Sequence, residues 1–168
     1  MTASFPNGTW QSWYDAYGRK LLLFARQWAS SAADAEDIVQ EAFIRFWRSN
    51  HRNDVDAHVQ LFAMVRRAGL DSTRMRLRRQ ARERAAMADE DEVTWFTPAE
   101  DGREKSREIK RALSRLPAGQ REVVVMKIWG ELTFEQIARS LRISPNTAAS
   151  RYRYGLQALR KSLNPISI

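Results

Sequence analysis

The sequence predicts an all-α protein of two small helical domains, an N-terminal helical bundle and a C-terminal four-helix domain with a helix-turn-helix, joined by an acidic flexible linker. Three observations lead to this prediction. Apolar residues recur at spacings of three and four along most of the 168-residue chain. No segment sustains the two-residue alternation of a strand. A polar stretch at residues 83–104, rich in acids, interrupts the helical patterning.

The first domain, residues 1–82, is expected to hold three helices. One face of the first helix is aromatic and aliphatic at helical spacing, and consists of Trp10, Trp13, Tyr14, Tyr17, Leu21, Phe24 and Trp28. Ser30 and Ser31 end this helix, and Asp34 is the expected N-cap of the next. The third helix follows a polar turn at residues 51–54, and its apolar positions are Leu61, Phe62, Val65 and Ala68.

The second helix has two distinct faces. Its core stripe consists of Ala35, Ile38, Val39, Ala42 and Phe46. Its polar face, a candidate interaction surface, consists of Asp37, Gln40, Glu41, Ile44 and Arg48. Phe43 and Trp47 form a further aromatic edge. This edge indicates either a protein interface or additional burial within the bundle.

The linker, residues 83–104, carries more acids than basic residues. We expect it to be solvated and extended, or to lie across one of the basic surfaces as a weak autoinhibitor. Trp95 and Phe96 could instead dock on one of the domains.

The second domain, residues 105–168, contains the most informative motif of the chain. Thr133 is a good N-cap and Gln136 follows three residues later, as a capping box requires. Residues 142–144 form a tight turn, Ser144 caps the next helix, and Pro145 occupies its first position, where a missing N–H costs nothing. Two short helices joined in this way form a helix-turn-helix, whose second helix enters the major groove of DNA.

The chain has no acid after Glu135, so the second helix of this motif is basic and suited to DNA. Its first turns present Asn146, Thr147, Ser150 and Arg151. Asn pairs with adenine, Arg with guanine, and the Thr methyl group contacts thymine. The complete candidate DNA-binding set here is Arg142, Ser144, Asn146, Thr147, Ser150, Arg151 and Arg153. Arg139, Arg142 and Arg160 lie outside the first turns and are expected to reach phosphates at most.

A second basic cluster lies between residues 66 and 84 in the first domain. Its candidate DNA-binding residues are Arg66, Arg67, Asp71, Arg74 and Arg78. Asp71 shares a helical face with Arg67 and Arg74 and can pair with either. An exposed pair contributes only about 0.3–0.5 kcal/mol, so its expected use is to orient the arginines.

Composition narrows the function classes. A formal net charge of +8 favours a polyanionic partner, and the absence of cysteine excludes disulfides and thiolate metal sites. No apolar run is long enough to cross a membrane, and the N-terminus lacks the regions of a signal peptide, so we expect a cytoplasmic protein without membrane insertion. His51 and His58 lack metal-ligand spacing. We therefore predict no catalytic residue, no metal and no cofactor.

Three segments together resemble the extracytoplasmic-function group of bacterial RNA polymerase sigma factors. Residues 33–47 (ADAEDIVQEAFIRFW) resemble that family's polymerase-docking helix, and residues 70–74 (LDSTR) resemble the segment after its promoter-melting helix. Residues 113–122 and 132–138 are similar to its second domain. The chain departs from the family pattern at Gln60, where Trp is usual, at Arg67, where Asn is common, and at Ala148 and Ala149.

The resemblance implies a transcription initiation factor that binds core RNA polymerase and promoter DNA. The first domain would dock on the polymerase and recognise and melt the −10 DNA, and the second would bind the −35 element. An anti-sigma factor is a further candidate partner. The alternative is a helix-turn-helix regulator that acts without polymerase, but such a regulator needs neither the polar face of the second helix nor the second basic cluster.

Overall fold

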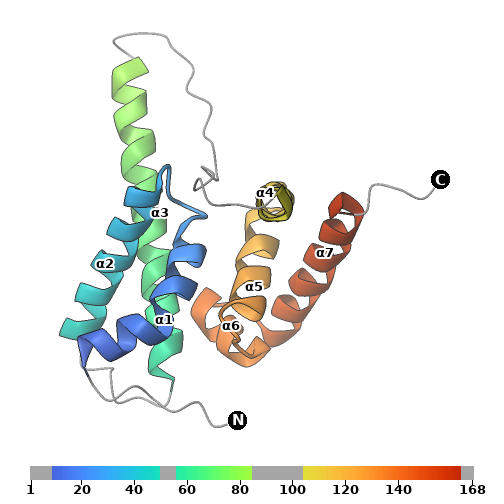
Figure 1. Cartoon of the computed structure of the whole chain (residues 1–168), viewed down its shortest axis with the longest axis horizontal. Coiled ribbons are helices and arrows are strands. Elements are labelled where there is room, and N and C mark those ends of the chain that lie inside the picture. Colours follow the sequence, from blue (N-terminus) through green and yellow to red (C-terminus); the bar gives the residue numbers. More distant parts are fainter. Residues whose placement is uncertain (1–8, 50–55, 85–103, 164–168) are drawn as a thin grey trace.

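The structure is a computed structural model that describes residues 9–49, 56–84 and 104–163 (Figure 1). These residues form helices α1 to α7 and no strand, which confirms the predicted all-α class. Helices α1–α3 make up the first module and α4–α7 the second. None of the described helices is both long and apolar enough to span a membrane.

Helix α1 (Trp10–Ala25) ends earlier than its aromatic periodicity predicts. The side chain of Thr9 caps it by accepting the backbone N–H of Ser12 at 3.3 Å. Trp28 lies beyond the helix, although we expected it on the same face. It is nevertheless 5% exposed, and its ring packs edge-on against Phe24 at 5.0 Å between centroids. Burial of the indole therefore does not require a continuous helix.

The N-cap of α2 (Ala32–Arg48) is Ser31, so the prediction of Asp34 as the cap is wrong. Ser31 Oγ accepts the backbone N–H of Asp34 at 3.1 Å. Asp34 instead stands in the first turn, where its carboxylate favours the positive end of the helix dipole. It also accepts the backbone N–H of Ser30 at 3.2 Å.

The aromatic edge of α2 packs into the core of the first module. Phe43 is fully buried and Trp47 is half-buried. Trp10 of α1 covers both, with ring centroids 5.2 Å from Phe43 and 5.8 Å from Trp47. Tyr14 adds a further ring at 5.7 Å from Phe43. Of the two alternatives for this edge, burial is the one observed.

Helix α3 (Ala57–Arg84) extends beyond the other helices of its module (Figure 1). Its first half is buried in the bundle, whereas Met75 and Leu77 in its second half are 70% and 53% exposed. The helix continues through Glu83, which we assigned to the linker and which pairs with Arg79 at 2.8 Å. The other acids of the linker, up to residue 103, and the question of autoinhibition by them, lie outside the described residues.

The second module is the predicted four-helix unit, with α4 (Glu104–Ser114), α5 (Ala118–Ile128), α6 (Phe134–Leu141) and α7 (Pro145–Leu163). The capping box of α6 is confirmed: Thr133 Oγ1 accepts the N–H of Gln136, and Gln136 Oε1 accepts the N–H of Thr133. Arg142 ends α6 in the left-handed conformation, with φ at 54°. This sharp turn lets α7 start three residues later at a new angle.

The two modules pack against each other. Helices α5 and α6 contact α1 and α3, and the buried residues of both modules form one continuous core (Figure 1). The approach is close at Gly130, where an added Cβ would lie 3.1 Å from the ring of Phe62. We call this packed state the closed arrangement.

Candidate nucleic-acid interface

The N-terminus of α7 presents the predicted reading residues on a well-capped helix. Ser144 Oγ accepts the backbone N–H of Thr147 at 3.0 Å, and its hydroxyl lies 2.8 Å from that of Thr147. Asn146 is exposed, and Ser150 is half-buried one turn further on. The opposite face packs inward through Ala148 and Leu159. The helix is therefore fixed by its core face, and Asn146 is exposed in its first turn.

The three arginines predicted around α7 have different surroundings. Arg142 is exposed in the turn. Arg153 is exposed too, and its guanidinium lies over the ring of Tyr154 at 5.0 Å, a cation–π contact that restricts it. Arg151 is half-buried and faces α5, where its guanidinium would be only 3.0 Å from a Cβ added at Gly119.

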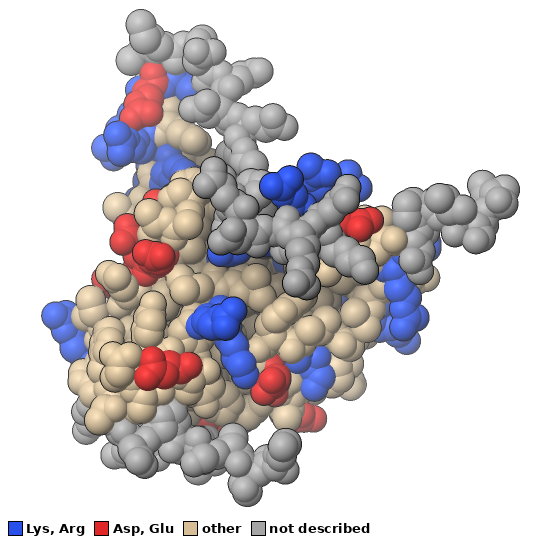
Figure 2. Space-filling model, viewed as in Figure 1, with Lys and Arg blue, Asp and Glu red and all other residues tan. Residues whose placement is uncertain are grey.

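The projecting half of α3 carries most of the second basic cluster. Arg67, Arg74 and Arg78 are exposed. Asp71 pairs with Arg74 at 3.5 Å, one of the two pairings that the spacing allowed, and also lies 3.9 Å from Arg45 of α2. Figure 2 shows Lys and Arg gathered on this projecting end and again along α4 and α7. Both modules therefore present a positive surface to solvent.

Arg66 differs from the rest of its cluster because it forms an ion pair between the two modules. Its Nε donates to Glu122 Oε1 of α5 at 3.2 Å, and the Glu122 carboxylate is 8% exposed. Burial raises the pKa of Glu122, and the positive charges of Arg66, Arg121 and Arg151 oppose that rise. Arg121 is itself buried, which lowers its pKa, and its Nε lies 3.4 Å from Gln27 Oε1 of the first module.

A cleft of about 500 Å³ separates the two candidate DNA-binding surfaces. One wall is α3 and the other is the end of α6 with its turn. The lining of the cleft includes Gln60 and the candidate DNA-binding residues Arg66, Arg67, Asp71, Arg74 and Arg142. The closed arrangement thus brings the helix-turn-helix turn opposite the basic cluster of the first module.

The predicted polar face of α2 is exposed along its whole length. All five of its residues, Asp37, Gln40, Glu41, Ile44 and Arg48, are open to solvent. Glu41 is oriented by an ion pair with Arg45 at 2.7 Å, one turn along the helix. The core side of α2 consists of Ala35, Ile38, Val39, Ala42, Phe43 and Phe46, so the helix has one buried side and one exposed side.

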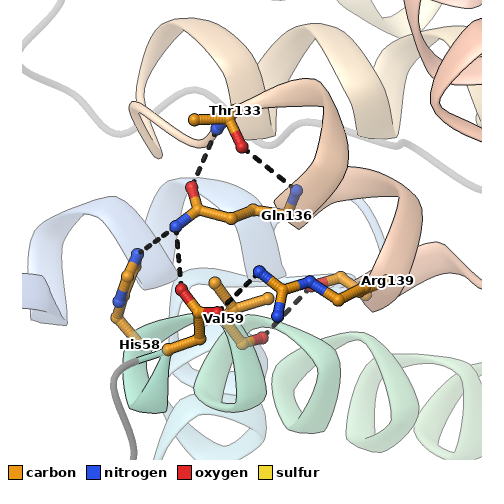
Figure 3. A network of polar contacts seen from close by, with 7 residues as sticks. His58, Val59, Thr133, Gln136 and Arg139 are labelled. Atoms are coloured by element: carbon orange, nitrogen blue, oxygen red, sulfur yellow. Dashed lines mark hydrogen bonds and ion pairs between the residues drawn. The ribbon is translucent and has the colours of Figure 1, made fainter.

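Sequence reasoning missed a polar network between α6 and the start of α3 (Figure 3). Gln136 Nε2 donates to Asp56 Oδ1 at 3.1 Å and lies 3.5 Å from Nε2 of His58. The His58 ring stacks on Tyr17 at 5.9 Å, and burial lowers its pKa. Arg139 and Ser140 complete the network. The sequence singled out Gln136 for capping and Arg139 for phosphate contact, and neither signal indicated a contact with α3.

Comparisons with known families match both modules. The family described as "Sigma-70 region 2" matches residues 13–83, and "Sigma-70, region 4" matches residues 106–159. The two matches correspond to α1–α3 and to α4–α7, in the order that the sequence predicted.

Relatives of known name match over nearly the whole chain. The ECF RNA polymerase sigma factor SigL of Mycobacterium tuberculosis is 30% identical over 164 residues, which cover 92% of this chain and 89% of SigL. The ECF RNA polymerase sigma factor SigW of Bacillus subtilis is 27% identical over 165 residues, covering 90% and 87%.

Solved structures share the fold. The sigma factor RpoE from Bartonella quintana, in complex with the anti-sigma factor NepR, aligns with a TM-score of 0.71 at 22% identity, over 91% of this chain and 95% of that one. CnrH, in complex with the cytosolic domain of CnrY, aligns with a TM-score of 0.58 at 24% identity, over 95% and 92%. The fold, the order of the two regions and the full-length relatives agree, and this chain belongs to the ECF sigma factors, which direct RNA polymerase to promoters.

Proposed function

We propose that the two modules divide the work of promoter recognition. The first module docks on core RNA polymerase through the exposed face of α2 and recognises and melts the −10 DNA with α3. The second module binds the −35 element with α7. The observation that carries this proposal is that each surface stands on its own helix, which exposes polar or basic residues and is anchored by core packing along part of its length. Sigma factors are transcription initiation factors and not enzymes, so no catalytic step is assigned.

The α2 face suits a protein partner because it combines charge with an apolar residue. Asp37 and Glu41 are exposed acids, and Ile44 between them and Arg48 is 39% exposed. Like charges brought together at an interface cost several kcal/mol, whereas exposed charges contribute little to folding. Reversing the two acids should therefore affect docking much more than stability.

The −10 surface is the exposed part of α3. Melting requires a duplex contact together with a basic surface that holds an unpaired strand. The residues that we assign to it are Arg66, Arg67, Asp71, Arg74 and Arg78, with Asp71 orienting Arg74. The Nε–H of Arg66 becomes available to DNA when its pair with Glu122 is broken.

Co-elution with core polymerase tests the docking assignment. The double variant Asp37→Lys, Glu41→Lys should elute apart from the core enzyme while its circular dichroism stays normal. The matched control is Glu108→Lys on α4, an exposed acid outside the α2 face, which should still co-elute. Unchanged co-elution of the double variant would remove this face from docking. Failure of the wild-type chain to co-elute would favour the polymerase-independent regulator.

An anti-sigma protein is a further partner that we propose for this chain. The solved relatives RpoE and CnrH are bound to NepR and to the cytosolic domain of CnrY, respectively. Both relatives align with this chain over more than nine-tenths of its length. Affinity capture on the immobilised full chain, from cells in which its promoters are silent, should retain a protein that competes with core polymerase.

A further inference from the structure

One face of α6 holds the start of α3 through three polar side chains. Gln136, Arg139 and Ser140 stand at positions i, i+3 and i+4, so they share this face. Gln136 Nε2 donates to Asp56 Oδ1 at 3.1 Å, and Arg139 Nη2 lies 2.6 Å from Asp56 Oδ2. Ser140 Oγ donates to the backbone oxygen of Val59 at 3.2 Å (Figure 3). Asp56 therefore accepts from two α6 side chains at once.

The position of Arg139 on the helix-turn-helix is significant. It lies on α6, the first helix of the motif, and in such motifs the first helix crosses the DNA backbone while the second enters the groove. A guanidinium binds carboxylate and phosphate oxygens through the same charge-assisted N–H donors. The Asp56 carboxylate therefore occupies the donor that a DNA phosphate would use. Hydrogen bonds from Gln136 and Arg139 hold the pKa of Asp56 below its ordinary range, so it is ionised at neutral pH.

The closed arrangement also keeps DNA from the turn of the motif. Arg142 and Ser140 face α3 across the cleft of about 500 Å³, which is too small for a duplex. Two promoter elements centred about 25 base pairs apart are separated by on the order of 85 Å at 3.4 Å per base pair. In the closed arrangement Arg142 of the second surface lines the same cleft as Arg67 and Arg74 of the first, so these parts of the two surfaces lie much closer together than that. Both surfaces therefore engage a promoter only after the modules have separated.

We propose that Asp56 is an intramolecular phosphate mimic, and that Arg139 is a phosphate-binding residue of the helix-turn-helix that Asp56 masks until the modules separate. This inference rests on the assignment of the second module to −35 DNA. The Arg139 side chain is 59% exposed, so the pair contributes modestly and is readily exchanged for a phosphate. A partner that draws the modules apart thereby exposes a DNA contact in the same step.

The full chain provides a direct test, because it has no cysteine and accepts a pair of labels at Ala33→Cys and Glu108→Cys, exposed positions on α2 and α4. The probe is a short duplex carrying a −35 sequence selected from a randomised pool, and a scrambled duplex is its competitor. Saturating wild-type protein with the selected duplex should lower energy transfer between the labels, because binding requires separation.

Asp56→Asn removes the charge and keeps the shape of the side chain. This variant should bind the selected duplex about two- to fivefold more tightly at low salt, and the gain should shrink as salt screens the pair. Glu36→Gln on α2 makes the same change in net charge at an exposed site and is the control for general attraction to DNA. An Asp56→Asn variant that gains no more than this control would overturn the proposal.

Arg139→Ala tests whether Arg139 binds a DNA phosphate or only holds the two modules together. The variant loses the contact with Asp56 but also a phosphate contact, so its affinity should not rise and its salt slope should fall by about one. Tighter binding of Arg139→Ala with an unchanged salt slope would show that Arg139 only holds the modules together, and would refute the phosphate-mimic proposal. Unchanged energy transfer in the labelled wild-type chain at saturating duplex would also refute it. If the wild-type chain does not prefer the selected duplex to the scrambled one, the −35 assignment itself fails.

Discussion

Arg66 and Glu122, 56 positions apart in the sequence, form an ion pair of 3.2 Å that joins the predicted −10 surface to the buried start of α5. The carboxylate is almost inaccessible and the guanidinium is about one-third exposed. A residue assigned to DNA thus also stabilises the closed arrangement. Its two roles compete, since the Nε–H that donates to Glu122 is not available to an unpaired strand.

The buried carboxylate predicts a specific pH dependence. The pKa of Glu122 is raised above 4.5, so the folded protein binds a proton more readily than the unfolded chain above that pH. Its contribution to the free energy of unfolding therefore falls as the pH rises from 4.5 through the raised pKa. Glu122→Gln removes this titrating carboxyl group. The free energy of unfolding of the variant minus that of wild type should therefore increase as the pH rises over the same range. Urea unfolding of both proteins at a series of pH values measures this difference. A difference that stays constant or decreases with rising pH would contradict the prediction.

Two glycines in helices predict opposite effects of the same substitution. A Cβ added at Gly69 of α3 would lie 2.6 Å from the buried ring of Trp28, whereas one at Gly18 of α1 meets only the Tyr14 ring at an ordinary 3.4 Å. Gly69→Ala should lower the free energy of unfolding by about 1–2 kcal/mol, because overpacking outweighs the gain in helix propensity. Gly18→Ala should raise it by about 0.5–1 kcal/mol. Urea unfolding measures both changes in free energy. If Gly69→Ala also raises the free energy of unfolding, the ring of Trp28 moves aside without cost.

The capping box of α6 is expected to contribute measurably to stability. Thr133→Ala removes the hydroxyl that accepts the N–H of Gln136 at 3.2 Å, and should cost about 1 kcal/mol of unfolding free energy. Thr73→Ala is the matched control, because that hydroxyl only donates to the carbonyl of Gly69 within α3. The control should be neutral or slightly stabilising. If thermal or urea unfolding shows the same loss for both variants, the cap is not the cause.

Local signals account for what the sequence predicted well. The capping box, Ser144 and Pro145 lie within a few residues of the groups that they satisfy, so their spacing alone places α6, the turn and α7. The periodicity of α2 likewise separates its core stripe from its exposed face. The N-cap of α2 is Ser31 and not Asp34. Both residue types suit an N-cap and they stand three positions apart, so the sequence pattern alone does not decide between them.

Contacts between the modules left no comparable signal. Asp56 and Gln136 are 80 positions apart, and neither residue type indicates its partner. The burial of Phe43 depends on Trp10, a residue of another helix, so the apolar edge of α2 was open to two interpretations. Arg66 looks in sequence like its neighbour Arg67, yet only Arg66 faces Glu122. Tertiary packing decides such cases, and a helical pattern records only which face is apolar.

The surroundings of Arg151 sharpen the test of base reading by α7. We predict that Arg151→Ala loses about 1–3 kcal/mol on the preferred −35 sequence and discriminates poorly at one position, as a base-reading arginine would. Arg142→Ala, in the exposed turn, should weaken all sequences alike and lower the salt slope by about one. Binding to a panel of single-base −35 variants at two salt concentrations distinguishes the two effects.

Packing within the second module gives Arg151 a competing role, because its guanidinium lies against Gly119 of α5 and opposes the raised pKa of Glu122. If Arg151 is purely structural, Arg151→Ala should bind every DNA of the panel less tightly by the same factor. That loss should match the loss of folding stability measured in urea. An uneven loss at unchanged stability would identify a base contact. If the loss is even, specificity must rest on Asn146, Thr147 and Ser150, whose side chains stand in the first two turns of α7, where the groove floor is met.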